Sequence, residues 1–347
     1  MSTVRASLEE CIRASLRGKY SPPEITSTIV ARMSEPTYAP SIYFHGRHKN
    51  GVLYVGFPLK KPKLLRVFRK YLEQFCDAFP ESVFRVILFP THFKKMMPVR
   101  TPTPTPITAP ITAIHINSAM TTSFPSNPDM NNVIIYREEE CPKVLVHELC
   151  HYLNLDIPYG RGSDAVLMNR FHLKTDCFLS ETFCEVVGLL YNVYETSMCH
   201  PPSKHRISFR MLYTIEHTYT IFKTSQILDH YVIHTPNELY KLVSDTNTLT
   251  YTVFKGAYLE SLLEEHKDDL YDFTRDLIAN RFVIGDMAHG ALKALRAFRA
   301  HIVKGMRLLF AKYAILRRDV PLSMVTTHLP EEHPPLENSL RLTVVEE

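Results

Sequence analysis

Apolar and polar positions repeat with two different periods along this chain, and each period predicts one kind of element. Three short apolar runs in the first hundred residues have the length of strands, at 41–46, 52–57 and 82–89. The pair Asn50-Gly51 between the first two predicts a hairpin turn. Apolar residues then recur every three or four positions at 64–79, as on the buried face of a helix, and a shorter amphipathic segment lies at 7–16. These elements predict a small α+β unit.

Proline interrupts the pattern after residue 100. The Thr-Pro repeats of 101–113 exclude regular structure, because proline fixes φ and lacks a backbone N–H group. We expect an extended connector there, and a functional lid is the alternative. Strand patterns follow at 114–119 and 133–137.

Helical spacing dominates the rest of the chain. The predicted helices lie at 144–156, 178–194, 206–230, 249–265, 269–280 and 285–318, with a loop-like segment at 157–176 and a strand at 340–345. We therefore expect an N-terminal α+β region at 1–100, a Pro/Thr-rich linker at 101–113, and a larger region with a helical C-terminal lobe at 114–347. The predicted fold class is α+β.

The predicted helix at 144–156 contains the motif His147-Glu148-x-x-His151. Residues four apart lie on the same face of a helix, so both imidazoles can reach one zinc ion. Zinc lowers the pKa of a bound water to about 7, and Glu148 would stand beside that water as general base and later as general acid. The alternative is a hydrogen-bonded core cluster, since the chain is rich in histidine, with 17 in 347 residues.

The predicted helix at 178–194 offers a third ligand. Its acidic residues Glu181 and Glu185 lie four apart on one face of an otherwise apolar run, with Ser180 as a plausible cap. Two carboxylates on a buried face need a cation or a donor. Glu181 would bind the metal and Glu185 would accept a hydrogen bond from a ligand imidazole. The alternative is a half-exposed first turn, where acids are favourable with the helix dipole.

His147-Glu148-x-x-His151 followed by Glu181-x-x-x-Glu185 resembles the gluzincin group of zinc metallopeptidases. The metzincin pattern does not fit, because Asn154 and Ile157 stand where it needs Gly and His. A wider run is similar to metallopeptidases encoded by large DNA viruses. It comprises 115–119, 134–140, the motif helix and 339–346.

The resemblance implies a zincin-like fold, with a sheet-bearing N-terminal lobe, a helical C-terminal lobe and one Zn²⁺ per chain in the cleft. It implies a peptidase (hydrolase) that acts on a polypeptide substrate. An edge strand upstream of the motif helix would hold the substrate, and its residues here would be His115, Asn117 and Ala119. Candidates to stabilise the oxyanion are His172, Tyr159, Tyr191 and Tyr194.

Composition sets limits on compartment and partners. With 45% hydrophobic residues the chain is globular, and a net charge of +4 does not by itself imply nucleic acid or membrane. Seven cysteines without CxxC spacing, and no apolar N-terminal segment, favour a reducing intracellular compartment, either the cytoplasm or a virus particle. The cysteines around the motif are expected to be small core residues, with soft metal ligands as the alternative: Cys141, Cys150, Cys177 and Cys184. No apolar run is long enough for a transmembrane segment.

From 288 to 318 the last predicted helix has no acidic residue and carries a basic side opposite an apolar one. Such a helix can bind an anionic partner, whether nucleic acid, an acidic protein or a membrane surface, or it can pack on the core with its basic side in solvent. A second hypothesis for the whole chain is therefore a structural or interaction protein of a virus particle, with a stabilising zinc site and this basic helix as its partner-binding element.

Overall fold

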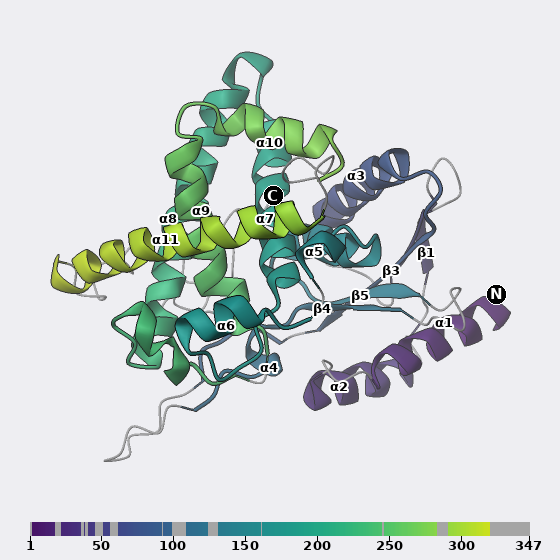
Figure 1. Cartoon of the computed structure of the whole chain (residues 1–347). Coiled ribbons are helices and arrows are strands. Elements are labelled where there is room, and N and C mark those ends of the chain that lie inside the picture. Colours follow the sequence, from purple (N-terminus) through teal and green to yellow (C-terminus); the bar gives the residue numbers. More distant parts are fainter. Residues whose placement is uncertain are drawn as a thin grey trace. The chain divides into compact units, whose positions relative to one another are not determined.

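The structure of the chain is a computed structural model (Figure 1). It describes residues 2–17, 22–35, 38, 41–45, 51–55, 62–91, 93–98, 109–123, 131–160, 162–244, 246–282 and 291–319. Within these ranges the chain is mixed α and β, which agrees with the predicted α+β class. It divides into two compact units, which we call unit 1 (Met1–Lys94 and Asn117–Leu155) and unit 2 (Lys95–Ile116 and Asp156–Val345).

A five-stranded sheet forms the centre of unit 1, in the order β1-β2-β3-β5-β4. The strands are β1 (Ser41–His45), β2 (Gly51–Val55), β3 (Phe84–Thr91), β4 (Ala119–Thr122) and β5 (Asn132–Arg137). The three central strands run parallel, and each outer strand pairs antiparallel with its neighbour. The strands predicted at 41–46, 52–57, 82–89 and 133–137 are confirmed within two residues at each end. Of the predicted turn, Gly51 is the first residue of β2, and Asn50 lies outside the described residues.

Helices cover both faces of this sheet. Figure 1 shows α3 (Pro62–Ala78) and α5 (Cys141–Tyr152) on one face, and α1 (Ser2–Ser15) and α2 (Pro23–Met33) on the other. All six residues of β5 are buried, as expected for a central strand covered on both sides. The helical spacing of 64–79 is confirmed, because Phe68, Tyr71, Leu72, Phe75 and Cys76 are all buried.

The helix α2 was not predicted from the sequence. Pro22-Pro23 reads as a break, but Pro23 occupies the first helical position, where a missing N–H group has no consequence. Ile25, Ile29 and Met33 then form its buried face at helical spacing. A proline pair therefore marks the start of a helix here.

Helices are the main elements of unit 2 among its described residues, which also contain one isolated β-bridge between Ile111 and Ser244. Its α-helices are α4 (Ala113–Ile116), α6 (Ala165–Phe171), α7 (Leu179–Ser197), α8 (His205–His230), α9 (Lys255–Glu265), α10 (Leu270–Ala279) and α11 (Ala291–Asp319). A π-helical segment, Leu249–Phe254, leads into α9, and three short 3-10 helices lie at Ile157–Tyr159, Pro202–Lys204 and Pro236–Lys241. The helices predicted at 178–194, 206–230 and 269–280 are confirmed, and the one predicted at 249–265 is π-helical in its first part.

Two segments predicted as irregular have structure of their own. The loop-like segment at 157–176 contains α6, whose N-cap Asp164 accepts a hydrogen bond from the backbone N–H of Leu167 at 3.0 Å. The end of the Pro/Thr-rich segment is not a plain connector, because Ile111 is fully buried and its N–H donates to the Tyr231 hydroxyl at 3.0 Å. Residues 101–108 and the predicted strand at 340–345 lie outside the described ranges.

The two units also differ from the three predicted regions, because sheet pairing brings 117–155 together with the N-terminal segment. The division into three regions stays a prediction. Among the described residues, no helix combines the length and the apolar character that crossing a bilayer requires.

Candidate metal centre

The motif helix α5 begins directly after the central strand β5. Glu140 lies in the left-handed region with φ 60° and turns the chain, and Pro142 occupies the first turn of the helix. Every residue from Cys141 to Cys150 is buried, because α5 packs on β4, β5 and α3. Within unit 1, the motif therefore lies on a helix that packs on the sheet and on α3.

His147 and His151 lie one helical turn apart, and their rings meet. Their Nε2 atoms are 3.2 Å apart, and the ring planes are inclined by 68° with 4.9 Å between centroids. His147 is 4% exposed, and His151 is half-buried. The helical spacing therefore brings both imidazoles to one point, as the sequence predicts.

The spacing of these two nitrogens fits a shared zinc ion. Tetrahedral ligands at about 2.0–2.1 Å from zinc lie about 3.3–3.4 Å from each other, close to the 3.2 Å between the two Nε2 atoms. A direct hydrogen bond between two neutral imidazoles has a similar length. The distance thus fits both a metal site and a hydrogen-bonded core cluster. Measuring the metal content of the purified protein distinguishes the two.

Glu148 is the next residue on α5, and its carboxylate is held by the sheet. The hydroxyl of Thr121 on β4 lies 2.7 Å from Glu148 Oε2 and 3.0 Å from the Glu148 carbonyl oxygen, and it can donate to either. Glu148 is 8% exposed. Burial raises the pKa of the nearby Tyr136 hydroxyl and the Glu148 carboxylate raises it further, while Arg137 acts in the opposite direction. Thr121 could not be singled out from the sequence, because its contact with Glu148 depends on how β4 packs on α5.

The strand predicted at 114–119 is partly wrong, and its role in holding a substrate stays a prediction. His115 lies in the short helix α4, where its N–H bonds to the Thr112 carbonyl at 2.9 Å and its Nδ1 accepts from the Thr112 N–H at 3.0 Å. Asn117 precedes the strand and is buried. Only Ala119 belongs to β4, which lies at one edge of the sheet among the described strands and pairs antiparallel with β5. An edge strand is therefore present, but it begins at residue 119.

The proposed third ligand belongs to unit 2. Glu181 is half-buried in the first turn of α7, whose N-cap is Phe178, so Ser180 is not the cap. This place fits an acid attracted to the helix dipole as well as a metal ligand. Since the positions of the parts of the chain relative to one another are not determined (Figure 1), the joining of Glu181 to His147 and His151 stays a prediction.

Glu185 has a partner that the sequence did not suggest. Its Oε2 lies 3.5 Å from Nζ of Lys255, the first residue of α9, and both side chains are buried. A buried carboxylate is costly unless a cation compensates it, and Lys255 provides that charge. The role of Glu185 beside a ligand imidazole is untested and stays a prediction.

The candidate oxyanion residues are distributed over unit 2. His172 is exposed at the C-cap of α6 with φ 52°. Tyr159 is buried and stacks on Phe183, while Tyr191 is buried against Phe282. Tyr194 packs on Tyr271. Burial, and to a smaller extent the neighbouring Tyr271, raises the pKa of Tyr194 to about 12, so its hydroxyl stays protonated and can donate a hydrogen bond. Their roles stay predictions.

The four cysteines expected in the core are indeed buried and unbridged: Cys141, Cys150, Cys177 and Cys184. Burial raises the pKa of the Cys177 thiol. The alternative of soft metal ligands for these cysteines stays untested.

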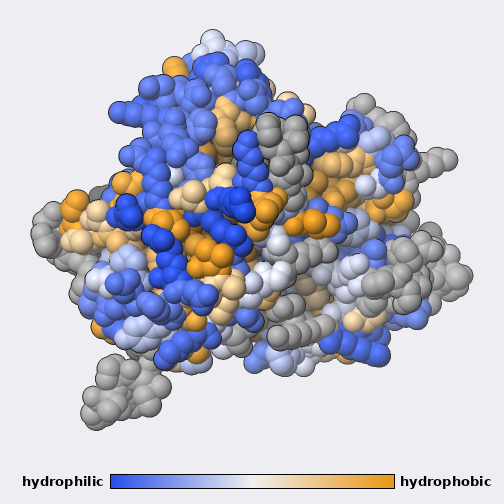
Figure 2. Space-filling view, viewed as in Figure 1, coloured by the Kyte–Doolittle hydropathy of each residue, from blue (hydrophilic) through white to orange (hydrophobic). Residues whose placement is uncertain are grey.

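The predicted basic helix corresponds to α11, and its charges are partly neutralised within unit 2. Arg299 pairs with Asp164 at 2.7 Å, and Lys312 pairs with Glu260 at 2.7 Å. Lys304 lies 2.8 Å from Glu264 and 3.0 Å from Glu265. Figure 2 shows hydrophilic and hydrophobic residues side by side on the face that carries α11. An anionic partner for this helix stays a proposal.

Comparison of the chain with protein-family models, with curated proteins and with solved structures found no match.

Proposed function

We propose that this protein is a zinc-dependent peptidase that hydrolyses peptide bonds with an activated water. The observation that carries the proposal is the meeting of His147 Nε2 and His151 Nε2 at 3.2 Å, with Glu148 as their neighbour on the same helix. Glu181 would complete the ligand set from unit 2. Three protein ligands leave one position open, which is the arrangement of catalytic zinc sites.

The bound zinc would supply a Lewis acid that polarises the scissile carbonyl and makes water acidic at neutral pH. Glu148 would take the proton from the attacking water and return it to the leaving amine. The Thr121 hydroxyl supports this role, because it holds the carboxylate of Glu148 from the side of β4. We infer that β4, which is an outer strand among the described ones, would pair with an extended polypeptide through main-chain hydrogen bonds.

The test uses the purified full chain loaded with zinc and a library of quenched-fluorescent peptides. We expect hydrolysis by the wild type, and in Glu148→Gln an unchanged zinc content with a rate lower by about a hundredfold or more, as for the loss of a general base. Glu24→Gln, an exposed position on α2, is the matched control and should keep full activity. Hydrolysis that persists in Glu148→Gln would contradict the mechanism.

The same experiment separates the second hypothesis. A stabilising zinc site in a structural protein has four protein ligands and no open position. Bound zinc that raises the melting temperature, together with no hydrolysis of any library peptide by the wild type, would favour a structural or interaction protein over the peptidase.

A further inference from the structure

A cavity of about 610 Å³ lies within unit 2, and nothing in the proposed peptidase chemistry uses it. Residues of α8, α9, α10 and α11 line it, so it is built by four helices of one unit. Its volume falls in the range of sites that hold a ligand or the anchoring side chains of a peptide. Apolar and aromatic side chains form much of its wall, among them Phe209, Tyr213, Leu263 and Leu308.

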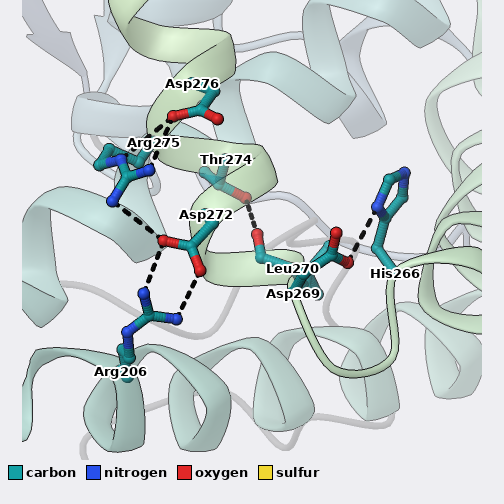
Figure 3. A network of polar contacts seen from close by, with 8 residues as sticks. All are labelled: Arg206, His266, Asp269, Leu270, Asp272, Thr274, Arg275 and Asp276. Carbon is teal, nitrogen blue, oxygen red and sulfur yellow. Dashed lines mark hydrogen bonds and ion pairs between the residues drawn. The ribbon is translucent and has the colours of Figure 1, made fainter.

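The wall formed by α10 is fixed by ion pairs, as Figure 3 shows. Arg206 on α8 bonds both carboxylate oxygens of Asp272, at 2.5 and 2.7 Å, and its guanidinium lies 5.1 Å from the centre of the Tyr271 ring. Arg275 adds a contact to Asp272 at 3.0 Å. A bidentate arginine pair has a defined geometry, so this side of the cavity is formed before any ligand binds.

A buried carboxylate on α9 forms another part of the lining. Glu260 is 3% exposed, and its two oxygens lie 3.0 Å from Nε2 of His217 and 2.7 Å from Nζ of Lys312. Burial alone would raise the pKa of Glu260, but the neighbouring His217 and Lys312 side chains outweigh it and hold the pKa below its usual value. The charge of Glu260 is therefore compensated from inside the unit and does not repel an acidic ligand strongly.

Two cations of the lining are not compensated in this way. Within the described ranges, no ion pair or hydrogen bond joins the side chain of Arg210 or Lys267 to another group, and both residues are exposed. Among the described residues, Asp268 is the one carboxylate of the lining whose side chain likewise makes no ion pair or hydrogen bond. The other exposed carboxylate, Glu264, is paired with Lys304. The cavity thus has a surplus of positive charge at its exposed residues next to an apolar wall.

The apolar surface continues along α8 beyond the cavity. Ile207 lines the cavity and is 72% exposed, and Met211 and Ile215 follow at intervals of four residues with 55% and 44% exposed. Residues four apart form one row on a helix. A compact small molecule would leave this row in water, whereas a polypeptide segment can cover the cavity and the row together.

We propose that this cavity and the row Ile207, Met211 and Ile215 bind a short segment of a partner protein that carries apolar side chains flanked by acidic ones. Apolar side chains would enter the cavity and cover the row on α8, and acidic side chains would pair with Arg210 and Lys267. This site is independent of the metal centre and of the proposed peptidase activity.

The test measures binding of two labelled peptides to the full chain by fluorescence anisotropy. Both peptides carry the same leucines; in one they are flanked by glutamates and in the other by lysines. We expect the glutamate peptide to bind about tenfold more tightly than the lysine peptide, because Arg210 and Lys267 attract glutamates and repel lysines. Equal binding of the two peptides, or binding of neither, would overturn the proposal.

Variants assign the binding to this surface. Ile207→Asp and, independently, Met211→Asp should each weaken binding about tenfold. The double variant Arg210→Glu with Lys267→Glu should reverse the preference toward the lysine peptide. The matched controls lie on α11 outside the cavity: Ile315→Asp, at a position 58% exposed, and Lys293→Glu should leave binding unchanged. If the control variants weaken peptide binding as much as the test variants do, the assignment to this surface is wrong.

Sedimentation of the chain alone tests a second copy as the occupant. We expect the sedimentation coefficient to be the same for the wild type and Ile207→Asp over a range of concentrations. Self-association that Ile207→Asp abolishes would show that the row joins copies of this chain, and the proposal of a foreign acidic segment would be wrong.

Discussion

At the residue scale, the contact between Thr121 and Glu148 joins the motif helix to the edge of the sheet. The hydroxyl lies within hydrogen-bonding distance of both the carboxylate and the carbonyl of Glu148, so one side chain on β4 fixes the direction of the proposed general base. A hydrogen bond to a charged group contributes about 1.5–3 kcal/mol, enough to select one rotamer. Thr121 is thus a positioning residue in the proposed mechanism.

The substitution Thr121→Val tests this role. It keeps the shape of the side chain and removes the donor, so we expect kcat/KM for peptide hydrolysis to fall about tenfold, mainly through kcat. Zinc content should stay at the wild-type level, and Thr121→Ser should restore most of the rate. An unchanged rate in Thr121→Val would show that Glu148 is oriented by other contacts.

Glu238 carries a pH dependence of stability that is separate from the metal centre. The hydrogen bond from Lys241 has the largest effect on the Glu238 carboxylate, and the N–H groups of His234 and Thr235 add to it. Together they lower the pKa of Glu238 from 4.5 to about 2. Because the folded-state pKa is depressed, the contribution is fully present above pH 4.5 and is lost as the pH falls to about 2.

We therefore expect Glu238→Gln to lower the free energy of unfolding above pH 4.5, with a difference from the wild type that shrinks toward pH 2. Urea unfolding followed over this range measures it. Lys241→Met removes the leading cause and should show the same trend at smaller amplitude. A difference independent of pH would contradict the assignment to Glu238.

At the scale of elements, the crossing of α9 and α11 depends on one glycine. A Cβ atom at Gly305 would lie 1.6 Å from the carbonyl oxygen of Ala257, a distance that no side chain can occupy. The backbones of the two helices therefore approach each other directly at this point. Gly256, a glycine on α9 itself, has more room, since the nearest contact of a Cβ atom there would be the Thr224 hydroxyl at 3.1 Å.

The substitution Gly305→Ala should force α11 away from α9 and lower the free energy of unfolding by about 3 kcal/mol or more, beyond the usual cost of overpacking. Urea unfolding of the full chain gives the value. Gly256→Ala is the matched control and should change stability by less than about 1 kcal/mol, because alanine is the better helix former and the clash is small. Equal effects of the two substitutions would contradict a special role of Gly305.

The elements that the sequence predicts well are those whose apolar spacing is long and regular. The helices α3 and α8 appear where the pattern places them, since Phe68, Tyr71 and Leu72 in one and Phe209 and Leu228 in the other are buried. Ile215, which has the same spacing on α8, is 44% exposed, so that part of the predicted core face is wrong. The missed elements are short or depend on distant partners. Helix α6 has seven residues and a cap at Asp164, and α4 replaces the first half of a predicted strand through local bonds of Thr112 and His115.

At the scale of the whole molecule, the motif could be predicted because its geometry is local. A four-residue interval on a helix suffices to bring His147 and His151 together, whatever the rest of the fold does. Thr121 could not be predicted, because its place beside Glu148 depends on the pairing of β4 with β5 and on the packing of α5 against them. Glu181 was singled out only by its place in an apolar helix, and it belongs to the other unit.

The central claim, one zinc ion held by ligands from both units, is tested most directly by elemental analysis of the purified full chain. The measurement compares the wild type with His147→Ala, Glu181→Ala and the control His205→Ala, whose ring bonds to the carbonyl of His200 at the start of α8. We predict one zinc per chain in the wild type and in the control, and loss of zinc in both ligand variants. Zinc that remains bound in Glu181→Ala, or a wild type that takes up no zinc on reconstitution, would contradict the three-ligand site.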